Sequence, residues 1–138
     1  DAVTGATLLT QQWGEYDTDF FVVGDFIGDS RADFAAWRGF GNGLNGNWYI
    51  RENGGAGQQI ITQFGIASAT QAAGDRPVCG DFDGNGKSDI AVYRQSNKTF
   101  YWLTNPANGA TNNAFTMTYP AETATPTGDF AIGQLQTW

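Results

Sequence analysis

A short loop near the middle of the chain gathers oxygen side chains in a pattern that suits a metal ion. Ca²⁺ takes about six to eight oxygen ligands, and side chains at alternating loop positions can surround one ion. Here they stand at loop positions 1, 3, 5 and 9. The predicted calcium ligands are the side chains of Asp81, Asp83, Asn85 and Asp89 and the backbone carbonyl of Lys87. Two intervening glycines, Gly84 and Gly86, supply the backbone freedom for so tight a turn.

The flanks of this loop differ from those of the helix–loop–helix calcium motif. That motif has a glutamate at position 12, where this chain has Val92. Residues 77–79 and 90–93 are typical of strands, so we predict a calcium loop between two β-strands. The alternative is an acidic hairpin turn without metal, since Asp, Asn and Gly are common in turns. Three carboxylates in nine residues repel each other without a cation, which favours the metal.

The loop belongs to an internal repeat. A shift of 56 residues aligns residues 19–38 with residues 75–94, including Gly24-Asp25-Phe26 with Gly80-Asp81-Phe82. The first copy places Ile27 at a ligand position, and its weaker predicted site consists of Asp25, Asp29, Arg31 and Asp33. A third copy at Gly128-Asp129-Phe130 lacks the later ligands. Asp19 and Asp75 also recur in register, so we expect a structural role for them, as turn caps or in the calcium shell.

The two repeats resemble the FG-GAP or VCBS repeats of bacterial surface proteins. The resemblance rests on Val22-Val-Gly-Asp-Phe, on Val78-Cys-Gly-Asp-Phe-Asp-Gly-Asn-Gly-Lys-Ser-Asp, and on the aromatic strands that follow, and it covers about residues 12–134. Similar repeats build the integrin α-subunit propeller, and lectins of the Psathyrella velutina type use a related pattern. The resemblance implies β-propeller blades of four antiparallel strands with calcium loops. Such blades serve adhesion, sugar binding and accessory roles alike.

Short apolar runs between turn clusters independently predict an all-β fold in a single repeat domain, residues 1–138. Repeat 1 covers about 12–62, repeat 2 about 63–120, and a partial repeat 121–138. Second strands are expected at 33–38 and 89–94, third strands at Trp48-Tyr49 and Tyr101-Trp102, and outermost strands at 59–63 and 114–119. Residues 6–13 are left as an orphan outermost strand, and residues 127–138 as orphan first and second strands.

Two whole blades and a split third are fewer than the roughly four to eight blades that usually close a propeller. Several chains could assemble the ring, the chain could be a piece of a longer one, or the blades could pack in a smaller arrangement. Unpaired strand edges are seldom left open. We therefore expect a homo-oligomer in which residues 6–13 and 127–138 pair, within or between chains. The start at Asp1 without Met predicts a processed mature protein or an excised fragment.

Composition narrows the function classes. A formal net charge of −7 leaves no basic face for phosphates, so no nucleic-acid partner is expected, and no apolar run is long enough for membrane insertion. The chain contains no His, the usual general base, so we expect no enzyme, and a carboxylate-only hydrolase is the weakest class. With 19 Gly and many Thr, Asn and Gln, the composition is typical of a secreted, extracellular β-protein. The lone Cys79 is expected to be a small buried hydrophobe.

Aromatic side chains beside Asn- and Gly-rich loops point to a glycan or another cell-surface ligand. The predicted ligand-binding residues are Trp48, Tyr49 and Arg51, with Tyr101 and Trp102 in the second repeat. Packing between blades is the alternative for each aromatic ring. The sequence thus favours a secreted calcium-binding propeller-type module that is carbohydrate-binding (lectin-like) or adhesive. The alternative is a structural or accessory repeat segment of a larger secreted surface protein or glycan-active enzyme.

Overall fold

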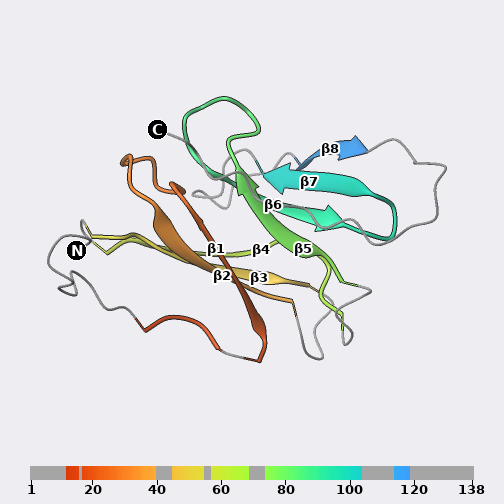
Figure 1. Cartoon of the computed structure of the whole chain (residues 1–138), viewed down its shortest axis with the longest axis horizontal. Coiled ribbons are helices and arrows are strands. Elements are labelled where there is room, and N and C mark those ends of the chain that lie inside the picture. Colours follow the sequence, from red (N-terminus) through yellow and green to blue (C-terminus); the bar gives the residue numbers. More distant parts are fainter. Residues whose placement is uncertain are drawn as a thin grey trace, which may run out of the picture.

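The computed structural model describes residues 12–15, 17–39, 45–54, 57–68 and 74–103, and the backbone of 114–118 (Figure 1). Eight strands and no helix occur in this part of the chain, and they form two antiparallel sheets of four. The first sheet contains β1 (Asp19–Gly24), β2 (Asp33–Arg38), β3 (Asn47–Arg51) and β4 (Gln59–Gln63), in that order. The second contains β5 (Arg76–Gly80), β6 (Asp89–Arg94), β7 (Thr99–Leu103) and β8 (Ala114–Thr118).

The predicted all-β fold of four-stranded antiparallel sheets is confirmed. β2, β4 and β6 have the expected bounds, and β8 ends at Thr118, one residue before the expected end. None of the described residues belongs to a helix long and apolar enough to cross a membrane. The orphan strands expected at 6–13 and 127–138 lie outside the described residues, except for Gln12 and Trp13.

The main core lies between the two sheets, where β1 contacts β5 (Figure 1). Paired residues of neighbouring strands share a face, and Phe20 pairs with Trp37, which pairs with Trp48. The fully buried core residues are Ala35, Trp37, Trp48 and Ile50 from the first sheet, and Ile90, Val92 and Leu103 from the second. Truncating one of these indoles to Ala would cost about 3–5 kcal/mol, so this interface holds the two sheets together.

The recurring acids Asp19 and Asp75 have the structural role that their repeat position predicted. Asp19 binds Arg38 through Nε at 2.7 Å, and Asp75 binds Arg94 in the same way at 2.8 Å. Burial raises the pKa of Asp19, but hydrogen bonds from Arg38, the Glu15 N–H and Thr18 outweigh it and lower the pKa overall. The alternative of a place in the calcium shell is wrong for Asp19, because this residue begins β1 and the loop follows the other end of that strand.

Candidate metal centre

The loop between β5 and β6 brings three carboxylates together. Oxygen atoms of Asp81, Asp83 and Asp89 all lie within 4.8 Å of one another, and no other such acidic group occurs in the described part of the chain. Ca²⁺–oxygen distances are about 2.3–2.6 Å, so two ligands on opposite sides of one ion are roughly 5 Å apart. One cation can therefore contact all three carboxylates, as the loop spacing predicted.

Backbone N–H groups of the same loop hold these side chains in place. Asp81 accepts hydrogen bonds from the N–H groups of Asn85 (2.9 Å) and Gly86 (2.8 Å), and Asp83 accepts one from Asn85 (3.1 Å). The Asn85 side-chain oxygen accepts one from the Lys87 N–H at 2.8 Å. Gly84 and Gly86 have φ of +77° and +86°, a region that residues with a Cβ rarely enter. The loop conformation therefore depends on both glycines.

Asp89 is the buried member of the group, with a relative exposure of 1%. Its carboxylate accepts a hydrogen bond from the Phe82 N–H at 2.8 Å. Burial raises the pKa of Asp89 to about 6, and the neighbouring charges of Asp83 and Asp81 act in the same direction. A cation beside these groups would favour the ionised carboxylate, so the site is electrostatically suited to a positive ion.

The corresponding loop between β1 and β2 provides more backbone N–H donors to its acids. Asp25 is buried and accepts hydrogen bonds from three backbone N–H groups, those of Gly28, Asp29 and Ser30. Asp33, also buried, accepts three more at 3.0 Å, from Phe26, Ile27 and Asn53. Asp29 accepts one from the N–H of Arg31. Backbone donors thus bind the carboxylates of this loop, and the weaker metal site at Asp25, Asp29, Arg31 and Asp33 stays a prediction.

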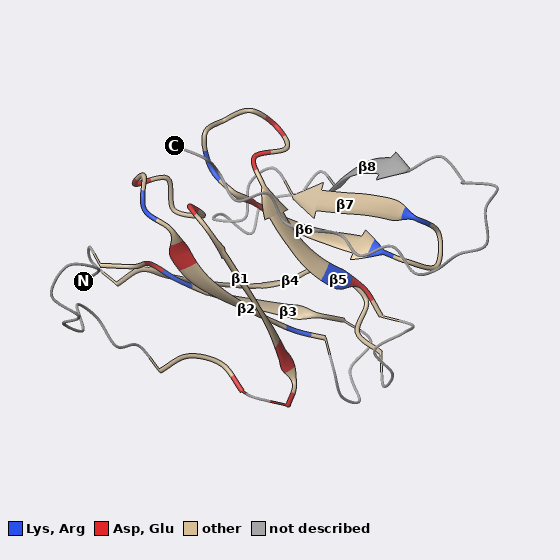
Figure 2. Cartoon of the chain, in the orientation of Figure 1, with Lys and Arg blue, Asp and Glu red and all other residues tan. Residues whose placement is uncertain are grey.

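The two loops lie at the same end of the two sheets and touch (Figure 2). The Ser88 N–H donates to the Asp25 carbonyl oxygen at 2.7 Å. A Cβ placed on Gly28 would lie only 2.4 Å from Cε of Lys87, so the aliphatic part of the Lys87 side chain lies along the first loop. That the Lys87 carbonyl contributes to a metal site stays a prediction.

The predicted ligand-binding aromatics do not form one surface. Trp48 is wrong as a sugar-stacking residue, because it is 0% exposed and packs against Phe26 in the core. Tyr49 points to the opposite face of the first sheet, since adjacent side chains of a strand alternate. Tyr101 and Trp102 are likewise on opposite faces, and Trp102 packs against Phe82 with ring centroids 5.4 Å apart.

Arginine side chains cover the partly buried rings of Tyr49 and Tyr101. Arg38 lies 5.1 Å from the ring centroid of Tyr49, and Arg94 lies 4.4 Å from that of Tyr101. Arg51, also partly buried, lies 5.7 Å from the ring centroid of Trp13. The Tyr–Arg contact occurs in both sheets, which points to a structural role for the two tyrosines.

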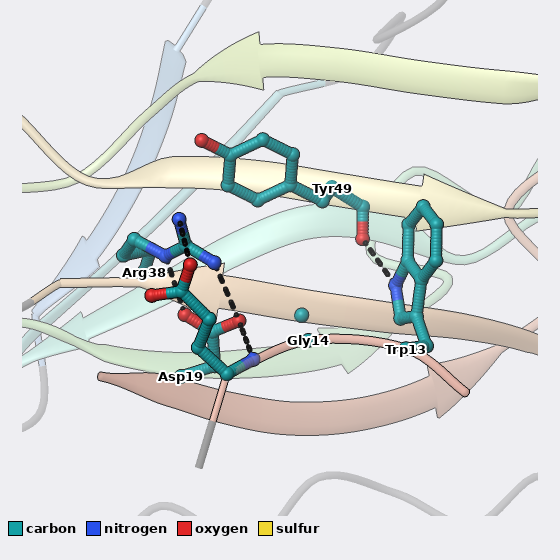
Figure 3. Close-up of a pocket in the computed structure, with 7 residues that line it drawn as sticks. Trp13, Gly14, Asp19, Arg38 and Tyr49 are labelled. Atoms are coloured by element: carbon teal, nitrogen blue, oxygen red, sulfur yellow. Dashed lines mark hydrogen bonds and ion pairs between the residues drawn. The ribbon is translucent and has the colours of Figure 1, made fainter. Parts of the chain in front are cut away.

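Sequence reasoning missed a pocket on the first sheet (Figure 3). Its volume is about 230 Å³, and its lining is Trp13, Gly14, Glu15, Asp19, Ala36, Arg38 and Tyr49. The indole N–H of Trp13 donates to the Tyr49 carbonyl oxygen at 3.4 Å, which places Trp13 across from Arg38 (Figure 3). A signal was available, because Gln12-Trp13-Gly14 matches Gln63-Phe64-Gly65 between the repeats.

Comparison of the chain with protein-family models, curated proteins and solved structures finds no match.

Proposed function

We propose that the chain is a secreted calcium-binding module of β-propeller type, with each four-stranded sheet acting as an FG-GAP/VCBS-type blade. The observation that carries the proposal is the convergence of Asp81, Asp83 and Asp89 within 4.8 Å. Asn85 and the Lys87 carbonyl complete the proposed ligand set, and the first loop is proposed as a weaker site. The stacking of two repeated sheets around one apolar interface supports the propeller architecture.

The calcium proposal is tested by titrating chelator-treated protein with Ca²⁺ and with Mg²⁺ in a calorimeter. One tight Ca²⁺ site and weaker Mg²⁺ binding are expected, because Mg²⁺ demands near-ideal octahedral geometry and gives up its water reluctantly. Heat changes no larger than those of a buffer blank would overturn the proposal.

For the ligand we propose carbohydrate recognition or adhesion without turnover. Tyr49, Arg51 and Trp13 support it, since aromatic rings beside a guanidinium can stack on a sugar and donate to its hydroxyl groups. A glycan array with Ca²⁺ present tests this, with Tyr49→Ala expected to lose binding and Ile66→Ala, at an exposed position outside that surface, expected to keep it. A blank array, or unchanged binding in Tyr49→Ala, would reject the glycan proposal.

The second candidate is a structural or accessory repeat segment within a larger secreted assembly. The complete burial of Trp48 and the repeated Tyr–Arg contacts favour it, because both use aromatic rings for packing. In either case we propose a homo-oligomer in which the strands expected at 6–13 and 127–138 complete a blade.

A further inference from the structure

One face of the first sheet, here called the open face, carries apolar side chains in a row, and three of the side chains on this face are exposed. It carries Phe21, Ala36, Tyr49 and Ile61, which pair in register across all four strands, and also Val23. Phe21, Val23 and Ile61 are 58%, 49% and 68% exposed. Phe21 and Val23 are neighbours on this face of β1, and Ile61 lies across the sheet on β4, so the exposed apolar side chains reach both edges of a candidate interaction surface.

The repeat shows what covers the same face in the second sheet. The 56-residue shift places Cys79 at the position of Val23 and Val92 at that of Ala36. Cys79 is 7% exposed and Val92 0%, because both lie in the core shared with the first sheet. The Cys79 thiol donates to the Val23 carbonyl oxygen at 3.0 Å. This face of the repeat is therefore built to receive a preceding sheet.

The pocket of Figure 3 belongs to the same comparison. The N–H and carbonyl groups of Glu15 bond Asp19 at 2.8 and 3.2 Å, and those of Ile66 bond Asp75 at 2.8 and 3.0 Å. Residues 63–66 are the end of β4 and the turn after it. Residues 12–15 thus contact the first sheet in the same way as residues 63–66 contact the second. Trp13 stands where Phe64 stands.

An indole fills the second copy of this pocket. A Cβ placed on Gly65 would lie 3.2 Å from the Trp37 ring, and the Trp37 N–H donates to the Phe64 carbonyl oxygen at 2.9 Å. At Gly14 the nearest atoms belong to Phe21 and Asp19 of the same sheet. The pocket is therefore the place that an aromatic ring of a preceding sheet would occupy.

We propose that the open face and its pocket dock the C-terminal end of a second copy of the chain, head to tail. The inference rests on the propeller-type stacking under the proposed function and names the partner. The second sheet packs on the side of the first sheet opposite the open face, so a further sheet added in the same way would pack on the far side of the second sheet. On that side Val78, Ala91 and Tyr93 are already buried, at 2%, 0% and 5% exposure. Sheets pack about 10 Å apart. The far side of the second sheet and the open face of the first sheet are therefore the two outer faces of the stack, on opposite sides of it. A head-to-tail contact of this kind is heterologous and closes into a ring if its rotation permits.

Sedimentation equilibrium of the whole chain over a concentration series, with Ca²⁺ present, tests the proposal. The wild type is expected at two or more times the 14.9 kDa of one chain. The double variant Phe21→Glu, Val23→Glu places charge on exposed positions of the open face and is expected to be a monomer with an unchanged circular dichroism spectrum. Ile66→Glu is the matched control, because Ile66 is 44% exposed, lies off this face, and has Glu15 as its counterpart. It is expected to keep the oligomer.

Each other outcome decides against the proposal. A wild-type monomer at every concentration would overturn it. A double variant that is a monomer like the wild type, but melts at lower temperature, would show that the chain's own residues cover the face. An oligomer that survives both glutamates would place the interface elsewhere.

The glycan array separates this inference from the proposed function. An oligomer lost in the double variant, with a blank array, would support docking and reject the lectin proposal. A glycan-binding monomer would reject docking and support the lectin proposal, since a sugar at Tyr49 requires an accessible open face.

Discussion

The loop between β1 and β2 and the loop between β5 and β6 occupy the same place in the repeat but differ in their acidic residues. In the first loop two buried carboxylates, Asp25 and Asp33, accept hydrogen bonds from six backbone N–H groups, five within residues 25–33 and one at Asn53. In residues 81–89 three carboxylates converge, and Asp83 stands where the first loop has Ile27. Among the positions at which the two loops differ, Asp83 in place of Ile27 adds the third carboxylate of the acidic group, beside which a cation would favour the ionised forms.

Removal of Ca²⁺ from the proposed site is expected to have the largest effect. A ligand that binds only the folded state adds about 4.1 kcal/mol of stability at a free concentration 1,000 times its Kd. We expect a chelator to lower the melting temperature by many degrees, measured by calorimetry at low ionic strength. The same melting curve with and without chelator would contradict the proposal that the second loop binds Ca²⁺.

Asp83→Ala removes one of the three converging carboxylates. Partners that merely orient a metal ligand already cost about 10–100-fold in affinity, so losing the ligand itself is expected to cost at least about 100-fold. The measurement is a Ca²⁺ titration. Ile27→Ala, at the same position of the first loop, serves as the control and is expected to leave the affinity unchanged.

A smaller effect is expected from pH in metal-free protein, because solvent screens part of this exposed loop. The pKa of Asp89 is raised to about 6 in the folded state from an ordinary value of 3.8. The unfolded state therefore binds fewer protons between these values, and the free energy of unfolding falls as pH rises from about 4 to about 6. Asp89→Asn should flatten this slope in urea titrations with chelator, and an equal slope in both proteins would contradict the assignment. With Ca²⁺ added, affinity should instead rise over the same window, since the ion requires the carboxylate.

The smallest effect concerns backbone strain. Ser30 has φ of +66°, whereas its counterpart Gly86 has φ of +86°. A left-handed conformation costs about 1–2 kcal/mol for a residue with a Cβ. In metal-free protein Gly86→Ser is expected to lower the free energy of unfolding by about 1 kcal/mol, since no other atom lies within 4 Å of the added Cβ. Ser30→Gly should raise it by less, because glycine also gains freedom in the unfolded chain. Denaturant midpoints of the two variants measure both changes.

The sequence was enough for the strands and for the acidic group. Asp33–Arg38 and Asp89–Arg94 align across the repeat, so their strand bounds followed from the alignment, and the spacing of Asp81, Asp83 and Asp89 placed three acceptors on one tight loop. The identity of the ion as calcium stays a prediction.

The features that could not be predicted depend on contacts with other strands and with the second sheet. Trp48 and Tyr49 are adjacent aromatics on opposite faces of β3, so alternation could not tell which ring the second sheet would bury. The N–H groups that point at Asp25 are a property of the backbone path rather than of side-chain type. The pocket beside Trp13 was missed although the match of Gln12-Trp13-Gly14 to Gln63-Phe64-Gly65 was a signal, because residues far apart in the sequence line it.

Cys79 lies in the interface between the sheets, with its thiol bound to Val23 and its pKa raised by burial. Thiol reagents attack the thiolate, so they can modify this sulfur only after the two sheets part. The rate at which a thiol reagent labels Cys79 therefore measures how often the interface opens. The rates with and without an ion in the loop that begins two residues later can be compared in the same way.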